Sequence, residues 1–107
     1  MNPSKSICVL VMSGPLKGHK FFVKSNSPIL IGRGTEANIK IAYDALCSRK
    51  HAVVYYEQDS CYLIDLKSTN GTFLNGERIS EKIKVKNKDV ISLGDTKLMV
   101  LINNSKS

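Results

Sequence analysis

The chain has 107 residues, of which 42% are hydrophobic, and this predicts one domain with its own core over residues 1–107. No apolar run approaches the roughly 18 residues of a membrane helix, and the apolar run at residues 7–12 is too short for a secretory signal. The 16 basic residues outnumber the 9 acidic ones, giving a net charge of +7, which predicts an anionic partner.

Short apolar runs separated by turn residues predict an all-β chain. Val and Ile together number 18 and Ala only 4, which favours strands over helices. The runs predict eleven strands, near residues 6–12, 20–23, 29–32, 38–41, 51–57, 61–66, 72–74, 77–79, 83–86, 89–93 and 97–102. The first and last runs are almost continuously apolar, so we expect them at the centre of a sheet. The polar residues 1–5 and 103–107 should fray, leaving a core at about 6–102.

Turn signals lie between these runs, at Ser13-Gly14-Pro15, Asn26-Ser27-Pro28, Asn70-Gly71, Asn75-Gly76 and Gly94-Asp95. Asn75-Gly76 predicts a two-residue hairpin turn in which both residues have positive φ angles. Residues 82–88 have lysine at every second position. We interpret this pattern as an edge strand protected by outward lysines, with Ile83 and Val85 facing the core.

The cysteines and histidines predict neither a metal site nor a disulfide framework. Cys8, Cys47 and Cys61 are an odd number without a CxxC pair, and neither His19 nor His51 lies at zinc-ligand spacing from them. We therefore expect no metal, no cofactor and a reducing compartment.

Enzymatic motifs fail on their context, which predicts a protein that is not an enzyme. Residues 32–37 fit the dinucleotide pattern G-x-G-x-x-G/A, but an alternating β-branched segment follows where a helix is required. Ser48 and His51, with Asp44 or Asp65 as orienting group, would suggest a nucleophile and base. No nucleophile-elbow pattern surrounds Ser48, and residues three apart at a strand start point to opposite faces.

An ordered set of loop residues resembles the forkhead-associated (FHA) domain, a phosphothreonine-recognition module. Gly32-Arg33 ends one predicted strand, Ser48-Arg49-Lys50-His51 opens another, and Ser68-Thr69-Asn70-Gly71-Thr72 forms a turn. Arg33 and Ser48 are 15 positions apart, and Ser48 and Asn70 are 22 apart, as the family pattern requires. The resemblance covers about residues 6–102. It implies a β-sandwich of two antiparallel sheets with the binding loops at one end.

The resemblance also implies a role for each matching residue. The residues that it implies for phosphopeptide binding are Arg33, Ser48, Arg49, Thr69 and Asn70. Of these, Arg49 would either contact the phosphate or only shape the rim of the site. Arg33 would donate charge-assisted hydrogen bonds to the phosphate, and Asn70 would bind the main chain of the ligand. The residues that it implies for structural support of the site are Gly32, His51 and Gly71.

The implied partner is a phosphothreonine-containing protein, either a Ser/Thr kinase or its substrate, in kinase-linked signalling or assembly. The loop before Ser48 presents the uncharged Ala45 and Leu46, which predicts a preference for an apolar residue three places after the phosphothreonine. The segment at residues 13–18 looks like that of bacterial members, so we expect a cytoplasmic protein that is a monomer as an isolated domain.

Two other functions stay open. The domain would be an adaptor if it bound an unphosphorylated protein surface. It would be a nucleic-acid binder if its 13 lysines formed a binding surface, but 7% aromatic residues and no Trp argue against a stacking platform. No membrane partner is expected.

Overall fold

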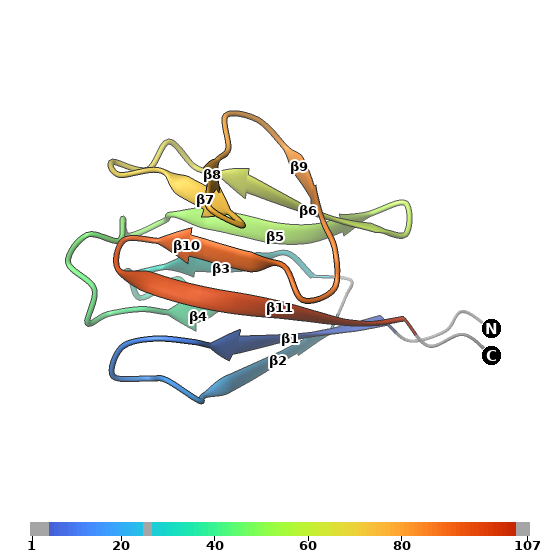
Figure 1. Ribbon diagram of the computed structural model, residues 1–107, viewed down its shortest axis with the longest axis horizontal. Coiled ribbons are helices and arrows are strands. Elements are labelled where there is room, and N and C mark those ends of the chain that lie inside the picture. Colours follow the sequence, from blue (N-terminus) through green and yellow to red (C-terminus); the bar gives the residue numbers. More distant parts are fainter. Residues whose placement is uncertain (1–4, 25–26, 105–107) are drawn as a thin grey trace.

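The computed structural model describes residues 5–24 and 27–104 as an all-β sandwich of two sheets (Figure 1). Its strands are β1 (Lys5–Val11), β2 (Lys20–Lys24), β3 (Ile29–Gly32), β4 (Ile39–Lys40), β5 (Ala52–Glu57), β6 (Ser60–Asp65), β7 (Thr72–Leu74), β8 (Glu77–Arg78), β9 (Ile83–Val85), β10 (Val90–Leu93) and β11 (Thr96–Asn104). Each predicted strand has a counterpart in the structure, and most strand ends differ from the predicted ones by one or two residues. Across the described ranges, no helix has the length and apolar character needed to cross a membrane.

The predicted polar termini and the turn at 26–28 lie partly outside the described residues. Where the ends are described, β1 begins at Lys5 and β11 runs on to Asn104, so pairing extends slightly beyond the predicted core.

The first sheet has six strands in the order β2-β1-β11-β10-β7-β8. The first and last long strands are neighbours near its middle, as their apolar sequences predicted, with Val9 opposite Val100. Figure 1 shows β10 and β11 in front of β3, which belongs to the second sheet.

The second sheet has five strands in the order β4-β3-β5-β6-β9. All its pairs are antiparallel except β3 and β4, which are parallel, with Ile31 opposite Ile39. The parallel pair arises because Asn38 binds Leu30 twice: its backbone N–H donates to the Leu30 carbonyl and its Oδ1 accepts the Leu30 N–H, both at 2.8 Å. The antiparallel prediction therefore misses this two-residue pair.

The core fills the space between the sheets with alternate residues of each strand. Ile7, Val9 and Val11 of β1 face inward and are buried, as period-two alternation requires. Val85 is buried as predicted, but Ile83 is 37% exposed, so its predicted place in the core was wrong. The reason is that β9 pairs with β6 alone and forms the edge of its sheet, where the core does not extend under Ile83.

Hairpin turns follow the predicted chemistry. Asn75 and Gly76 have φ angles of 51° and 89°, which confirms the two-residue turn with positive φ at both positions.

The segments that follow β3, precede β5 and follow β6 all lie at one end of the sandwich, on the left of Figure 1. This end carries every residue predicted to bind the ligand.

Candidate phosphopeptide-binding site

The backbone after β3 lies directly against the backbone before β5. Arg33 N–H donates to the Ser48 carbonyl at 3.0 Å, and Gly34 N–H donates to the Arg49 carbonyl at 3.1 Å. A Cβ atom on Gly32 would lie 2.0 Å from the Arg49 carbonyl oxygen, so a residue without a side chain is needed for this approach. Gly32 therefore supports the site by bringing Arg33 next to Ser48.

The Arg33 side chain is exposed and held at one point. Its Nε donates to the Cys47 carbonyl at 3.0 Å, which fixes the orientation of the guanidinium, and the residue is exposed. No carboxylate among the described residues forms an ion pair with Arg33. A free, oriented arginine fork of this kind matches the geometry of a phosphate.

His51 joins two of the binding loops from inside the core. Its side chain is completely buried; Nδ1 accepts the Ser48 N–H at 2.9 Å, and Nε2 lies 2.8 Å from the Gly71 carbonyl. Because Nδ1 accepts, Nε2 carries the proton and donates to Gly71. Gly71 has a φ of 89°, the left-handed conformation that glycine adopts without strain.

The Ser48 hydroxyl connects these loops on the outer side. Its Oγ accepts the Thr69 N–H at 3.1 Å, and its own proton remains available for a ligand oxygen. Ser48 contacts His51 through its backbone N–H rather than its hydroxyl, so the two do not form a nucleophile and base. Asp44 and Asp65, the possible orienting groups, bind other partners.

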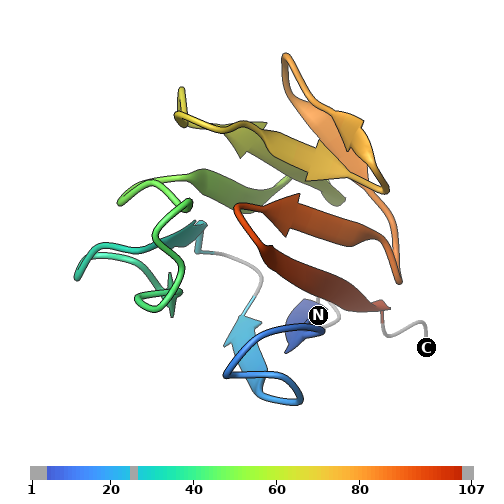
Figure 2. The ribbon, with the colours of Figure 1, turned by 60° about the vertical axis from the view of Figure 1, so that its left-hand side comes forward.

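Asn70 is exposed and bridges to the loop before Ser48. Its Nδ2 donates to the Leu46 carbonyl at 2.9 Å, which leaves one amide hydrogen and Oδ1 for a ligand. Thr69 is exposed beside it, while Arg49 is exposed and bonded through its backbone carbonyl. The structure thus brings all five predicted binding residues to one surface. Figure 2 shows the backbone at this end of the sandwich from another side.

Asp44 is a supporting residue that the sequence reasoning missed. Its carboxylate is 5% exposed and accepts the Leu46 N–H at 3.0 Å, the Asp95 N–H at 2.8 Å and the Thr96 hydroxyl at 2.7 Å. These bonds fasten the loop before Ser48 to the turn between β10 and β11. The i to i+2 bond from Leu46 is a local Asx turn that the sequence permits, but the bonds to Asp95 and Thr96 depend on the fold.

Asp65 fastens the turn that carries Thr69 and Asn70, and its role was also missed. Its carboxylate accepts the Ser68 N–H at 3.1 Å and the Ser68 and Thr72 hydroxyls, while Ser68 Oγ accepts the Gly71 N–H at 3.0 Å. Burial by itself would raise the pKa of Asp65, but the hydrogen bonds from Ser68 and Thr72 stabilise the carboxylate and bring its pKa below the ordinary value of 3.8. The three-residue spacing of Asp65 and Ser68 is the signal that could have indicated this turn.

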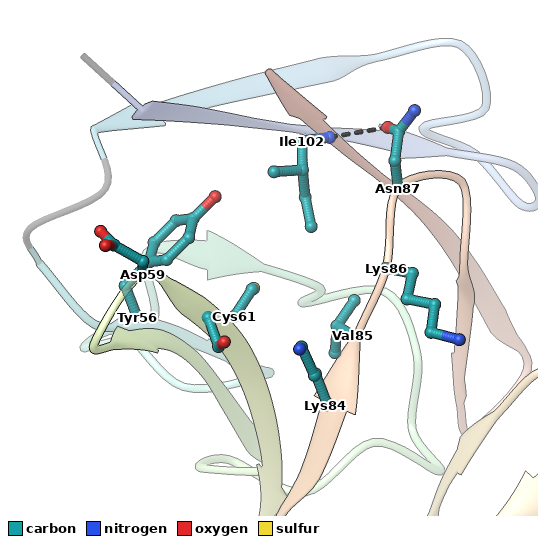
Figure 3. Close-up of a pocket in the computed structure, with 9 residues that line it drawn as sticks. Tyr56, Asp59, Cys61, Lys84, Val85, Lys86, Asn87 and Ile102 are labelled. Atoms are coloured by element: carbon teal, nitrogen blue, oxygen red, sulfur yellow. Dashed lines mark hydrogen bonds between the residues drawn. The ribbon is translucent and has the colours of Figure 1, made fainter. Parts of the chain in front are cut away.

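A pocket of about 280 Å³ opens at the other end of β5 and β6 (Figure 3). Tyr56, Cys61, Val85 and Ile102 contribute to its wall, and Asn87 accepts the Ile102 N–H at 2.8 Å. None of the eight predicted site residues lines this pocket. Within the described residues, no group of three or more His, Cys, Asp or Glu side chains could hold a metal ion.

Comparison with known proteins relates this arrangement to a family. The family model described as FHA domain matches residues 29–94. The chain is 35% identical over 83 residues to "Probable E3 ubiquitin-protein ligase dma1" of Schizosaccharomyces pombe (strain 972 / ATCC 24843), covering 66% of this chain and 31% of that protein. It is 31% identical over 88 residues to "FHA domain-containing protein FhaB" of Mycolicibacterium smegmatis (strain ATCC 700084 / mc(2)155), covering 82% of this chain and 56% of that protein. The chain thus spans less than two thirds of either relative.

A solved structure from a study of phosphothreonine-dependent FHA domain interactions superposes with a TM-score of 0.82. The alignment has 27% sequence identity and covers 94% of this chain and 99% of that one. The similarity therefore extends over both sheets.

Proposed function

Because the chain belongs to the FHA domain family, we propose that it binds a phosphothreonine-containing segment of a partner protein. FHA domains are interaction modules, and a structurally similar member is described by its phosphothreonine-dependent interactions. The partner class that fits is a Ser/Thr kinase or one of its substrates.

The observation that carries this proposal is the convergence of three loops around one exposed arginine. Arg33 is oriented by the Cys47 carbonyl, Ser48 offers a hydroxyl proton, and Asn70 retains both a donor and an acceptor. A phosphate carries a charge of about −1.5 to −2 at neutral pH and three acceptor oxygens. Arg33 and Ser48 would bind the phosphate, and Asn70 would bind the main chain beside it.

We further propose that Leu46 selects an apolar residue three places after the phosphothreonine. Leu46 is 47% exposed, and its backbone carbonyl accepts the hydrogen bond from the Asn70 amide, so the residue lies beside the amide proposed to bind the ligand. Ala45 beside it is exposed and uncharged. A phosphopeptide library that selected aspartate at this place would contradict the assignment.

The decisive experiment is a calorimetric titration with one peptide in phosphothreonine, phosphoserine and unmodified forms, the sequence being chosen by library selection. We expect binding of the phosphothreonine form and loss of binding for the unmodified form. Equal affinity for the phosphorylated and unmodified peptides would refute phosphopeptide recognition and support an adaptor for unphosphorylated surfaces. Equal affinity for phosphothreonine and phosphoserine would refute only the choice of threonine.

A further inference from the structure

The outer face of the six-stranded sheet carries two apolar rows that cross several strands. Phe22, Cys8 and Leu101 lie opposite one another on β2, β1 and β11. The second row, Leu10, Met99 and Val90, crosses β1, β11 and β10. Because the intervening residues of β1, β10 and β11 are buried in the core, these side chains point away from it. We call these six residues the outer apolar face.

These side chains are at least partly exposed among the described residues. Phe22 is 77% exposed, and the other five are half-buried by their neighbours within the sheet. Contiguous apolar surface of this kind on a folded domain marks an interaction site. Phe22 also lies on β2, whose second edge pairs with no strand in the described part of the chain.

The charged residues that share the outward side of these strands are positive. Lys20 of β2 lies opposite Leu10 and ends the second row. The neighbouring row contains Lys97 of β11 and Arg78 of β8, with Ser92 and Phe73 between them. Among the described strand residues on the outward side of this sheet, none is acidic. A second copy of the same face would oppose lysine to lysine, whereas an acidic partner would complement it.

The dimensions of the face fit one helix. From β2 to β10 the rows span three strand spacings, about 14 Å, and the two rows are about 7 Å apart along the strands. An α-helix is about 10–12 Å wide, so a few turns cover the rows. A stable dimer needs about 800 Å² from each partner, whereas the two rows extend over only about 14 Å by 7 Å. A bilayer requires side chains that penetrate it, and here only Phe22 is more than half exposed.

We propose that the outer apolar face docks a short, acidic amphipathic helix of a partner protein, separately from the loops that carry Arg33 and Asn70. Apolar side chains of the helix would pack on the two rows, and its carboxylates would lie near Lys20 and Lys97. The domain would then contact two segments at once, one through its loops and one through its sheet.

The test uses a displayed library of random 20-residue peptides, selected against the whole domain. We expect enrichment of peptides with apolar residues at helical spacing and an excess of Asp and Glu. The best peptide should lose at least tenfold in affinity to Phe22→Ser and to Lys97→Glu. The matched control is Ile83→Ser, which removes an equally apolar, exposed side chain from β9 in the other sheet and should leave affinity unchanged.

Cys8 supplies an independent readout without mutation. It lies in the outer apolar face, whereas Cys47 and Cys61 are buried, each with its pKa raised to about 11, chiefly by that burial. The selected peptide should slow alkylation of Cys8 in proportion to occupancy. It should leave phosphopeptide affinity unchanged, and Phe22→Ser should do the same.

Several results would overturn the proposal. These are no enrichment, enrichment of neutral or basic peptides, equal binding to Phe22→Ser, or no protection of Cys8. Concentration-dependent dimerisation abolished by Phe22→Ser would assign the face to a second copy. Phe22-dependent binding to vesicles of phosphatidylcholine and phosphatidylserine, without peptide enrichment, would assign it to a membrane.

Discussion

Replacing His51 by leucine is predicted to destabilise the domain while preserving the volume of the buried side chain. The change removes the acceptor for the Ser48 N–H and the donor for the Gly71 carbonyl. Each of the two groups left unpaired costs about 1–3 kcal/mol, so we expect a loss of about 2–6 kcal/mol in the free energy of unfolding. Since domains of this size are stable by about 5–15 kcal/mol, the variant should remain folded but weakened.

The assay is urea unfolding followed by far-UV circular dichroism, because the chain has no Trp to report by fluorescence. A loss of this size corresponds to a fall in Tm of about 10–25 °C. His51→Gln, whose amide has both a donor and an acceptor, should recover part of the stability. His19→Leu is the control, since His19 is exposed and its substitution should change stability by less than about 0.5 kcal/mol.

Phosphopeptide affinity separates the structural effect from general weakening. At a temperature where His51→Leu is fully folded, its affinity should still fall, because Ser48 and the Gly71 turn are no longer tied together. Stability within about 0.5 kcal/mol of the wild type would refute the reasoning that His51 holds the two loops. An unchanged affinity would show that the loops keep their positions without it.

Three further predictions concern binding and stability. Arg33→Ala should weaken phosphopeptide binding about tenfold to a hundredfold and make the affinity less dependent on salt concentration, and Arg33→Lys should recover part of the affinity. Asn70→Ala should also weaken binding, but the dependence of affinity on salt should stay as in the wild type. Calorimetry at several salt concentrations tests this, and an equal loss of salt dependence in both alanine variants would contradict these roles. Asp44→Ala should lower the free energy of unfolding by about 2–4 kcal/mol through its unpaired buried donors, whereas the exposed Asp95→Ala should lose far less in urea titrations. Because the pKa of Asp65 is lowered in the folded state, its contribution to stability is complete above about pH 5 and is lost as pH falls through that pKa. The Tm of Asp65→Asn should therefore fall less steeply with acid than the Tm of the wild type. An identical fall in both proteins would count against this role.

The strands could be predicted because they depend on local patterns. Almost continuous apolar runs predicted β1 and β11, and the paired positive φ angles followed from Asn75-Gly76. The exposure of Ile83 could not be predicted, since it depends on where β9 lies at the sheet edge rather than on its alternation.

The supports of the site depend on tertiary proximity and were therefore beyond local patterns. Asp44 and Thr96 are 52 positions apart, and only the assembled sandwich brings their side chains to 2.7 Å. The close backbone approach at Gly32 likewise becomes evident only when Arg49 lies against it. By contrast, the family resemblance predicted which residues share one surface, because it specifies the positions of three loops together.

The pairing of β1 with β11 has a consequence for folding kinetics. It places Lys5 opposite Asn104, 99 positions along the chain, so the contact closes almost the whole polypeptide. Loop closure of this length is unfavourable until other strands have formed, and we expect refolding in milliseconds to seconds. Until that pair closes, the β1–β2 hairpin and the β11–β10–β7 ribbon each present an unpaired apolar edge. The interval before closure is therefore the time of greatest aggregation risk.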